Sequence, residues 1–115
     1  MTPTIGRIVH FRLSASQAAE INEARSNIHP GGHERTQKHM GNSVAEGTVV
    51  PLVVTQVWPT EYQGGWLAHH EPGTKYESPV GVNGQALLDG NDSLWVCSAP
   101  QSATLPGCWF WPPKN

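Results

Sequence analysis

A polar stretch over residues 27–42, NIHPGGHERTQKHMGN, gathers several side chains that can bind metals or anions or transfer protons. Its histidine and basic residues are His29, His33, Arg35, Lys38 and His39. The histidine spacings of four and six match no common zinc pattern, and no cysteine lies nearby. Three interpretations stay open: a solvated loop, a loop that closes over an anionic ligand, and a metal site. The spacing of the histidines makes the metal site the least favoured of the three.

Two cysteines, Cys97 and Cys108, are too few for a zinc site, which takes four ligands. They can lie opposite each other if the last two strands pair, so a disulfide and two free thiols both remain open. No pattern places a histidine beside a nucleophile. A nucleotide hydrolase with His10, His39 or His69 as general base is therefore the last alternative. We expect neither catalysis nor a cofactor.

Composition predicts one soluble domain over residues 1–115. The chain is 37% hydrophobic and 14% charged, with 12 glycines, 10 prolines and a net charge of −2. Its seven Lys and Arg residues are scattered, which argues against binding to duplex nucleic acid. No apolar run approaches the ~20 residues of a membrane-spanning helix, and the first residues resemble no secretory signal.

The elements that must position any site begin with a strand over residues 4–13. Val9, Phe11 and Leu13 alternate onto one face of it. A short helix follows at about 14–27, with Ser14 as N-cap and Gln17 as its capping-box partner. Long polar loops are predicted at about 28–43 and 59–79.

The β-branched run of residues 44–58 predicts the strongest strand. Both of its faces are largely apolar, so we expect it to be central and buried. Pro51 has no N–H to donate to a sheet and therefore predicts a strand start or a bulge at that position.

A hairpin is predicted over residues 82–98, with Gly90 and Asn91 as a two-residue loop. This loop sets Ala86 opposite Trp95. A last strand at 108–111 would pair Cys108 with Cys97, with Trp109 and Trp111 on one face and Phe110 on the other. About five short strands and one N-terminal helix predict a mainly β fold: a small, strongly bent SH3-like barrel or a related roll.

Several segments together resemble a known family. They are IVHF at 8–11, Ile21-Asn22, HMGN at 39–42, VVPLVV at 49–54, VNGQALLDGNDSLWV at 82–96 and the final Trp-Pro. They resemble small proteins of tailed bacteriophages, especially phages of actinobacteria. The resemblance implies a phage-encoded protein in the cytoplasm of an infected bacterium, or in the virion, but no particular activity.

Two functions fit such a protein. The first is a counter-defence protein that binds and sequesters a host immune nucleotide without catalysis, either an ADP-ribose-derived Thoeris signal or a CBASS cyclic dinucleotide. It needs rings for stacking and polar groups for ribose and phosphate. The candidate ligand-binding residues are Trp58, Trp95 and Trp109 for stacking, Asn83 and Asp92 for ribose, Arg25, Arg35, Lys38 and His39 for phosphate, and Asn42.

The second function is that of a virion structural or assembly protein that acts through protein–protein contacts. In that case each candidate has a structural role: Trp95 in the core, for example, or Asp92 in the hairpin turn. A homodimer or higher homo-oligomer is expected in both cases, because an alanine-faced helix covers little apolar surface.

Overall fold

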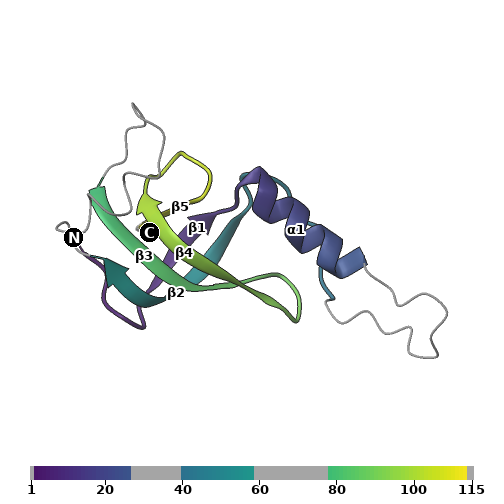
Figure 1. The fold of residues 1–115 in the computed structure, drawn as a ribbon, viewed down its shortest axis with the longest axis horizontal. Helices are drawn as coiled ribbons and strands as arrows, with labels where there is room; N and C mark the ends of the chain where they lie inside the picture. The colour runs from purple at the N-terminus through teal and green to yellow at the C-terminus, as the bar shows by residue number, and fades with distance from the viewer. Residues whose placement is uncertain (1, 27–39, 59–77, 114–115) are drawn as a thin grey trace.

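The computed structural model describes residues 2–26, 40–58 and 78–113, and its strands form one closed barrel (Figure 1). In chain order the elements are β1 (Ile8–Arg12), α1 (Ala15–Ser26), β2 (Val49–Trp58), β3 (Ser78–Leu87), β4 (Ser93–Gln101) and β5 (Cys108–Phe110). Pairing is antiparallel along β5–β1–β2–β3–β4, and one parallel pair, Gln101 with Trp109, joins β4 to β5. The prediction of a five-strand, mainly β barrel with one N-terminal helix is confirmed. Among the described residues, no helix has the length and apolarity needed to cross a membrane.

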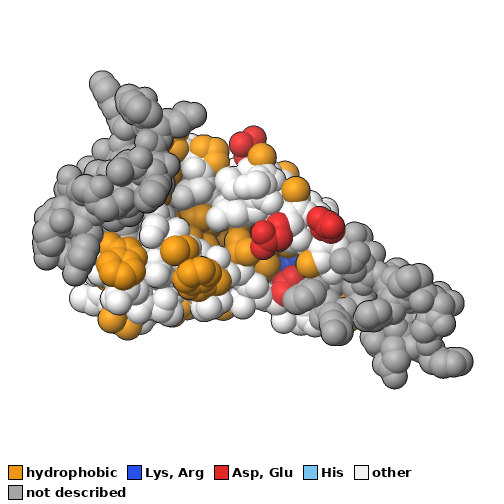
Figure 2. Space-filling view, in the orientation of Figure 1, with side chains coloured by type: hydrophobic (Ala, Val, Ile, Leu, Met, Phe, Trp, Pro, Cys, Tyr) orange, Lys and Arg blue, Asp and Glu red, His pale blue; other side chains and the backbone are white. Residues whose placement is uncertain are grey.

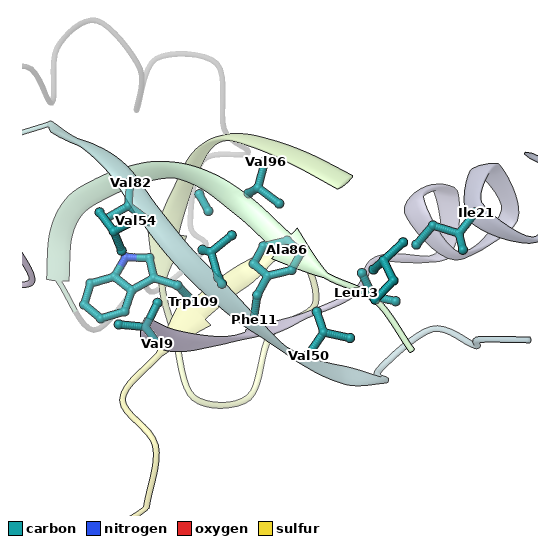
Figure 3. Packing of buried hydrophobic residues seen from close by; sticks show 13 residues of the cluster. Val9, Phe11, Leu13, Ile21, Val50, Val54, Val82, Ala86, Val96 and Trp109 are labelled. Carbon is teal, nitrogen blue, oxygen red and sulfur yellow. The ribbon is translucent and has the colours of Figure 1, made fainter. Parts of the chain in front are cut away.

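The barrel interior is filled by side chains from alternate strand positions. Val9, Phe11 and Leu13 are fully buried, as their alternation predicts. Trp109 is also fully buried, and in Figure 3 it lies at one end of the cluster while Ile21 of α1 lies at the other, beyond Leu13. The core therefore extends from the inside of the barrel to the underside of the helix.

Helix α1 begins with the predicted capping box. The Ser14 N–H donates to Gln17 Oε1 at 2.9 Å, and the Gln17 N–H donates to Ser14 Oγ at 3.2 Å. Its buried positions are Ala18, Ile21 and, unexpectedly for a charged residue, Arg25. Arg25 therefore needs a partner inside the protein.

The prediction that both faces of β2 are buried is wrong. Val50, Leu52 and Val54 face the core, whereas Val49 and Pro51 are exposed. The outer side of β2 therefore carries apolar side chains that are exposed or, like Val53, only half-buried.

Pro51 lies inside β2, and the bulge falls at Thr55 instead. The Val54 N–H donates to Arg7 O, so the N–H groups of even-numbered residues before the bulge point to β1. The nitrogen of Pro51 therefore points to the β3 side, where pairing begins only at Leu52 with Ala86. A residue without an N–H leaves no partner unsatisfied there.

The predicted register of the hairpin is wrong by one residue. Trp95 stands opposite Gln85, and Ala86 stands opposite Leu94. The turn spans residues 88–92 rather than two residues, and Gly90 is not among the glycines with positive φ. The cause is a tertiary contact, because Gly90 forms a bridge with Gly41 from a separate segment.

The last strand also pairs differently from the prediction. Cys108 lies opposite Arg12 of β1 rather than opposite Cys97, and both cysteines are free thiols. The predicted alternation is confirmed, since Trp109 is buried and stacks edge-to-face on Trp111 with ring centroids 5.6 Å apart.

Truncating Trp109 tests how far the barrel depends on this ring. We expect Trp109→Ala to lower the free energy of unfolding by about 3–5 kcal/mol, because it removes the largest fully buried side chain among the described residues and leaves a cavity. Urea denaturation followed by far-UV circular dichroism measures the change. Ile5→Ala, at a position 68% exposed, is the control and should change stability by about 0.5 kcal/mol or less. Equal losses in the two variants would contradict this packing.

Candidate functional site

Six of the ten candidate ligand-binding residues fall into two separate groups, and the first group surrounds a buried ion pair. Arg25 Nη2 and Nε donate to Asp92 Oδ1 and Oδ2 at 2.9 and 3.1 Å, which is a bidentate arrangement. Both side chains are only 5% exposed. The end of helix α1 is thereby tied to the turn between β3 and β4.

A third segment, residues 40–42, joins the same network. Arg25 Nη1 donates to the carbonyl oxygen of Asn42. The Asn42 backbone N–H and Nδ2 donate in turn to the carbonyl and carboxylate oxygens of Asp89, at 3.1 and 2.7 Å. Next to them, the Asn91 N–H donates to Met40 O at 2.8 Å. The Arg25 guanidinium group bonds to both other segments, and the hydrogen bonds of Asn42 and Asn91 join those two segments directly.

Two glycines make this close packing possible. A Cβ atom on Gly41 would lie 2.5 Å from Asp89 O and 2.8 Å from Arg25 Cζ. A Cβ atom on Gly90 would lie 2.8 Å from Gly41 Cα. Any larger residue at either position would push the turn away from the helix.

The network brings Arg25, Asn42 and Asp92 together, as expected for residues of one site. However, the charged groups of Arg25 and Asp92 are buried against each other, and Asn42 bonds to Asp89. Phosphate or ribose would have to break these bonds to reach them. We therefore interpret this group as a structural brace.

The second group lies on the outer surface of the barrel and contains Trp58, Asn83 and Trp95. Trp58 Nε1 donates to Asn83 Oδ1 at 3.0 Å, and the Ser98 N–H donates to the same oxygen at 2.7 Å. Asn83 stands opposite two β4 residues, Cys97 and Ser98, and Ser98 has the left-handed φ of 54° that such a bulge allows. The asparagine fixes the bulge and the tryptophan side chain together.

We define the β3 face as the outward residues of β3 together with the register partners of Gln85 and Leu87 on β2 and β4. Its members are Val53, Asn83, Gln85, Leu87, Ser93 and Trp95. Val53, Gln85 and Trp95 form one row across the three strands, since Gln85 is the register partner of both others. Trp95 is 58% exposed and Leu87 47%. Two large apolar side chains therefore face outward beside an amide.

The β3 face carries no charge. Strands β2, β3 and β4 contain no acidic, basic or histidine residue along their whole length. Figure 2 shows hydrophobic and uncharged side chains over the barrel in front of β3 and β4, whereas the acidic side chains seen in this view lie nearer the helix. The face suits an uncharged, partly apolar partner.

The other candidates do not join either group. Trp109 is fully buried inside the barrel, where no ligand at the surface can stack on it. Arg35, Lys38 and His39 lie outside the described residues, as does His69. His10 packs edge-to-face on Phe110, with ring centroids 5.5 Å apart. Within ranges 2–26, 40–58 and 78–113, no group of three or more histidine, cysteine or acidic residues could hold a metal ion.

Sequence reasoning missed Gln85, Leu87 and Val53 as surface residues. The available signal was the complete lack of charge in the three longest strands, which is unusual for strands with one side in water. It also missed the pairing of Arg25 with Asp92, for which the signal was an arginine four residues after Ile21 on the buried helix face.

Comparison with known proteins finds no matching family model, no matching curated protein and no matching solved structure.

Removing one partner of the buried ion pair should destabilise the fold strongly. We expect Asp92→Asn to lower the free energy of unfolding by about 3–5 kcal/mol, because the guanidinium group of Arg25 stays buried without a counter-charge. Urea denaturation gives the value, and Glu20→Gln on the exposed side of α1 is the control. In a double-mutant cycle, Arg25→Met with Asp92→Leu should cost clearly less than the sum of the single changes. Additive losses would contradict a direct pair.

Proposed function

We propose that this protein is a non-catalytic structural or assembly protein that acts through protein–protein contacts on the β3 face. The observation that carries the proposal is Trp95, 58% exposed on three strands without charge. The polar residues that a small ligand would need at the helix end are bonded to one another.

The chemistry of the β3 face is that of an interface centre. Interface centres are depleted of charged residues and enriched in aromatic ones, and tryptophan is prominent among residues that dominate binding energy. Trp95 and Leu87 supply exposed apolar area, and Gln85 and Ser93 supply hydrogen-bonding groups between them. Small-molecule sites, in contrast, are usually concave and bury most of their ligand.

The sequence resemblance supplies the setting of the proposal. A protein of this kind in a tailed bacteriophage would be part of the virion or of its assembly inside the infected bacterium. In both settings its partner is a protein, so activity should depend on the β3 face and on no catalytic group.

Photo-crosslinking tests the proposal directly. A photo-reactive phenylalanine analogue at exposed Ser93, beside Trp95, should give discrete higher-mass products in the cells where the protein is naturally made. Adding Trp95→Glu should abolish these products because it places a charge at the centre of the contact. Ile5→Glu, at another exposed apolar position, should leave them unchanged. Crosslinks that persist with Trp95→Glu, or none at Ser93, would contradict the proposal.

Nucleotide sequestration is the second candidate, favoured by one observation: Trp58, Asn83 and Trp95 share the outer surface of neighbouring strands. An exposed indole beside amide groups can stack a base and bond to its edge, and such stacking contributes about 1–3 kcal/mol per base. The lack of a cation on the described face counts against phosphate recognition there.

Thermal denaturation with added nucleotides distinguishes the two candidates. A sequestered ligand at a hundred times its dissociation constant should stabilise the fold by about 2.7 kcal/mol, which raises Tm by several degrees. The panel comprises ADP-ribose derivatives, cyclic ADP-ribose isomers and cyclic dinucleotides, and Trp95→Ala is the matched variant. A Tm shift that disappears in Trp95→Ala, with intact ligand recovered after heating, would establish sequestration. From the protein-contact proposal we expect no shift.

A further inference from the structure

The outward side chains of β3 form a line along the middle of the β3 face. Asn83, Gln85 and Leu87 are the outward positions of this strand, since the alternate residues Val82, Gly84 and Ala86 are buried. Val53 flanks Gln85 on one side and Trp95 flanks it on the other. The face therefore has a centre line of polar and aliphatic side chains, with the small side chain of Val53 on one flank and the large side chain of Trp95 on the other.

We propose that the partner on the β3 face is a second copy of this chain, related by a two-fold axis that runs along β3 between the two copies. This inference rests on the proposed function and names the partner in it. Such an axis exchanges the two flanks, so Trp95 lies over the partner's Val53. It also places Asn83, Gln85 and Leu87 over the same residues of the second copy, because these residues lie next to the axis.

The side chains along β3 can each pack against the same side chain of a second copy. The carboxamide of Gln85 carries both a donor and an acceptor, so two of them can exchange N–H···O hydrogen bonds across the axis. The Ser93 hydroxyl group lies 3.4 Å from Gln85 Oε1, which helps to hold the amide in position. Leu87, 47% exposed, would bury its side chain against the partner's Leu87.

The flanks match in shape as well. The outside of a small barrel is convex, so two barrels in contact along one strand diverge on both sides of it. The widening gap leaves room for a large side chain opposite a small one. Trp95 over the partner's Val53 meets this condition on both sides of the axis at once.

The distribution of charge permits two copies to meet at this face. Each copy carries a net charge of −2, which opposes association wherever like charges meet. Because β2, β3 and β4 contain no charged residue, the β3 face is where two copies can approach without that cost. Three strands at about 4.8 Å spacing make a small contact, so we expect reversible, concentration-dependent dimers.

A charge exchange at position 85 tests the symmetry. Gln85→Glu alone and Gln85→Lys alone each place like charges against themselves and should weaken self-association about tenfold or more at low ionic strength. An equimolar mixture of the two variants should restore dimers, because opposite charges then face each other. Sedimentation velocity measures all species, and near-UV circular dichroism verifies that each variant is folded. Ile5→Glu and Ile5→Lys are the controls and should dimerise normally, alone or mixed.

Each outcome decides the proposal. Weakened single variants with restored association in the mixture support it. Normal dimers of both single variants overturn it, because the contact then lies elsewhere, and a mixture that stays monomeric overturns the two-fold axis at β3. A wild-type chain that is monomeric at all accessible concentrations also overturns it. If Trp95-dependent crosslinks at Ser93 to another protein persist in that last case, the proposed function stands and only the second copy is excluded.

Discussion

Closure of the sheet is the constraint on which the other features depend. The sheet closes because β1 pairs with both β2 and β5 and because β4 pairs with β5, so along most of each strand side chains alternate between the barrel interior and the outer surface. A barrel of five strands has an interior that side chains fill completely, here with Trp109, Phe11 and Leu52 among others. Recognition must therefore take place on the outer surface or in the connecting segments.

The buried ion pair between Arg25 and Asp92 acts at one end of this barrel. A buried ion pair contributes little net stability compared with apolar residues of similar volume, because both charges lose their hydration. Its effect is geometric, since a bidentate pair accepts few arrangements. Together with Asn42 and Asp89 it fixes where the helix ends and how the hairpin turns. The same bonds withdraw these polar groups from ligand binding.

Local sequence signals predicted the parts of the fold that depend on local physics. The alternation of Val9, Phe11 and Leu13 and the capping box of Ser14 and Gln17 both appear as expected. Local sequence signals gave wrong predictions where a segment distant in sequence determines the local structure. Gly90 is a good residue for a two-residue turn, but Gly41 pairs with it and enlarges the turn. The candidate residues split for the same reason, because no sequence pattern says that Arg25 and Asp92 bind each other.

The structural brace at the helix end and the composition of the β3 face are connected through the register of the hairpin. A shift of one residue in a hairpin register exchanges the two sides of one strand relative to the other. With a two-residue turn, Trp95 would share its side with Ala86, whose side chain is buried in the barrel, and would have to enter a core already filled by Trp109. The larger turn, held by Arg25, Asp92 and the close approach of the two glycines, places Trp95 beside Gln85 on the outside instead. The contacts that bury the polar groups at the helix end thus also determine which side chains of the hairpin the barrel exposes.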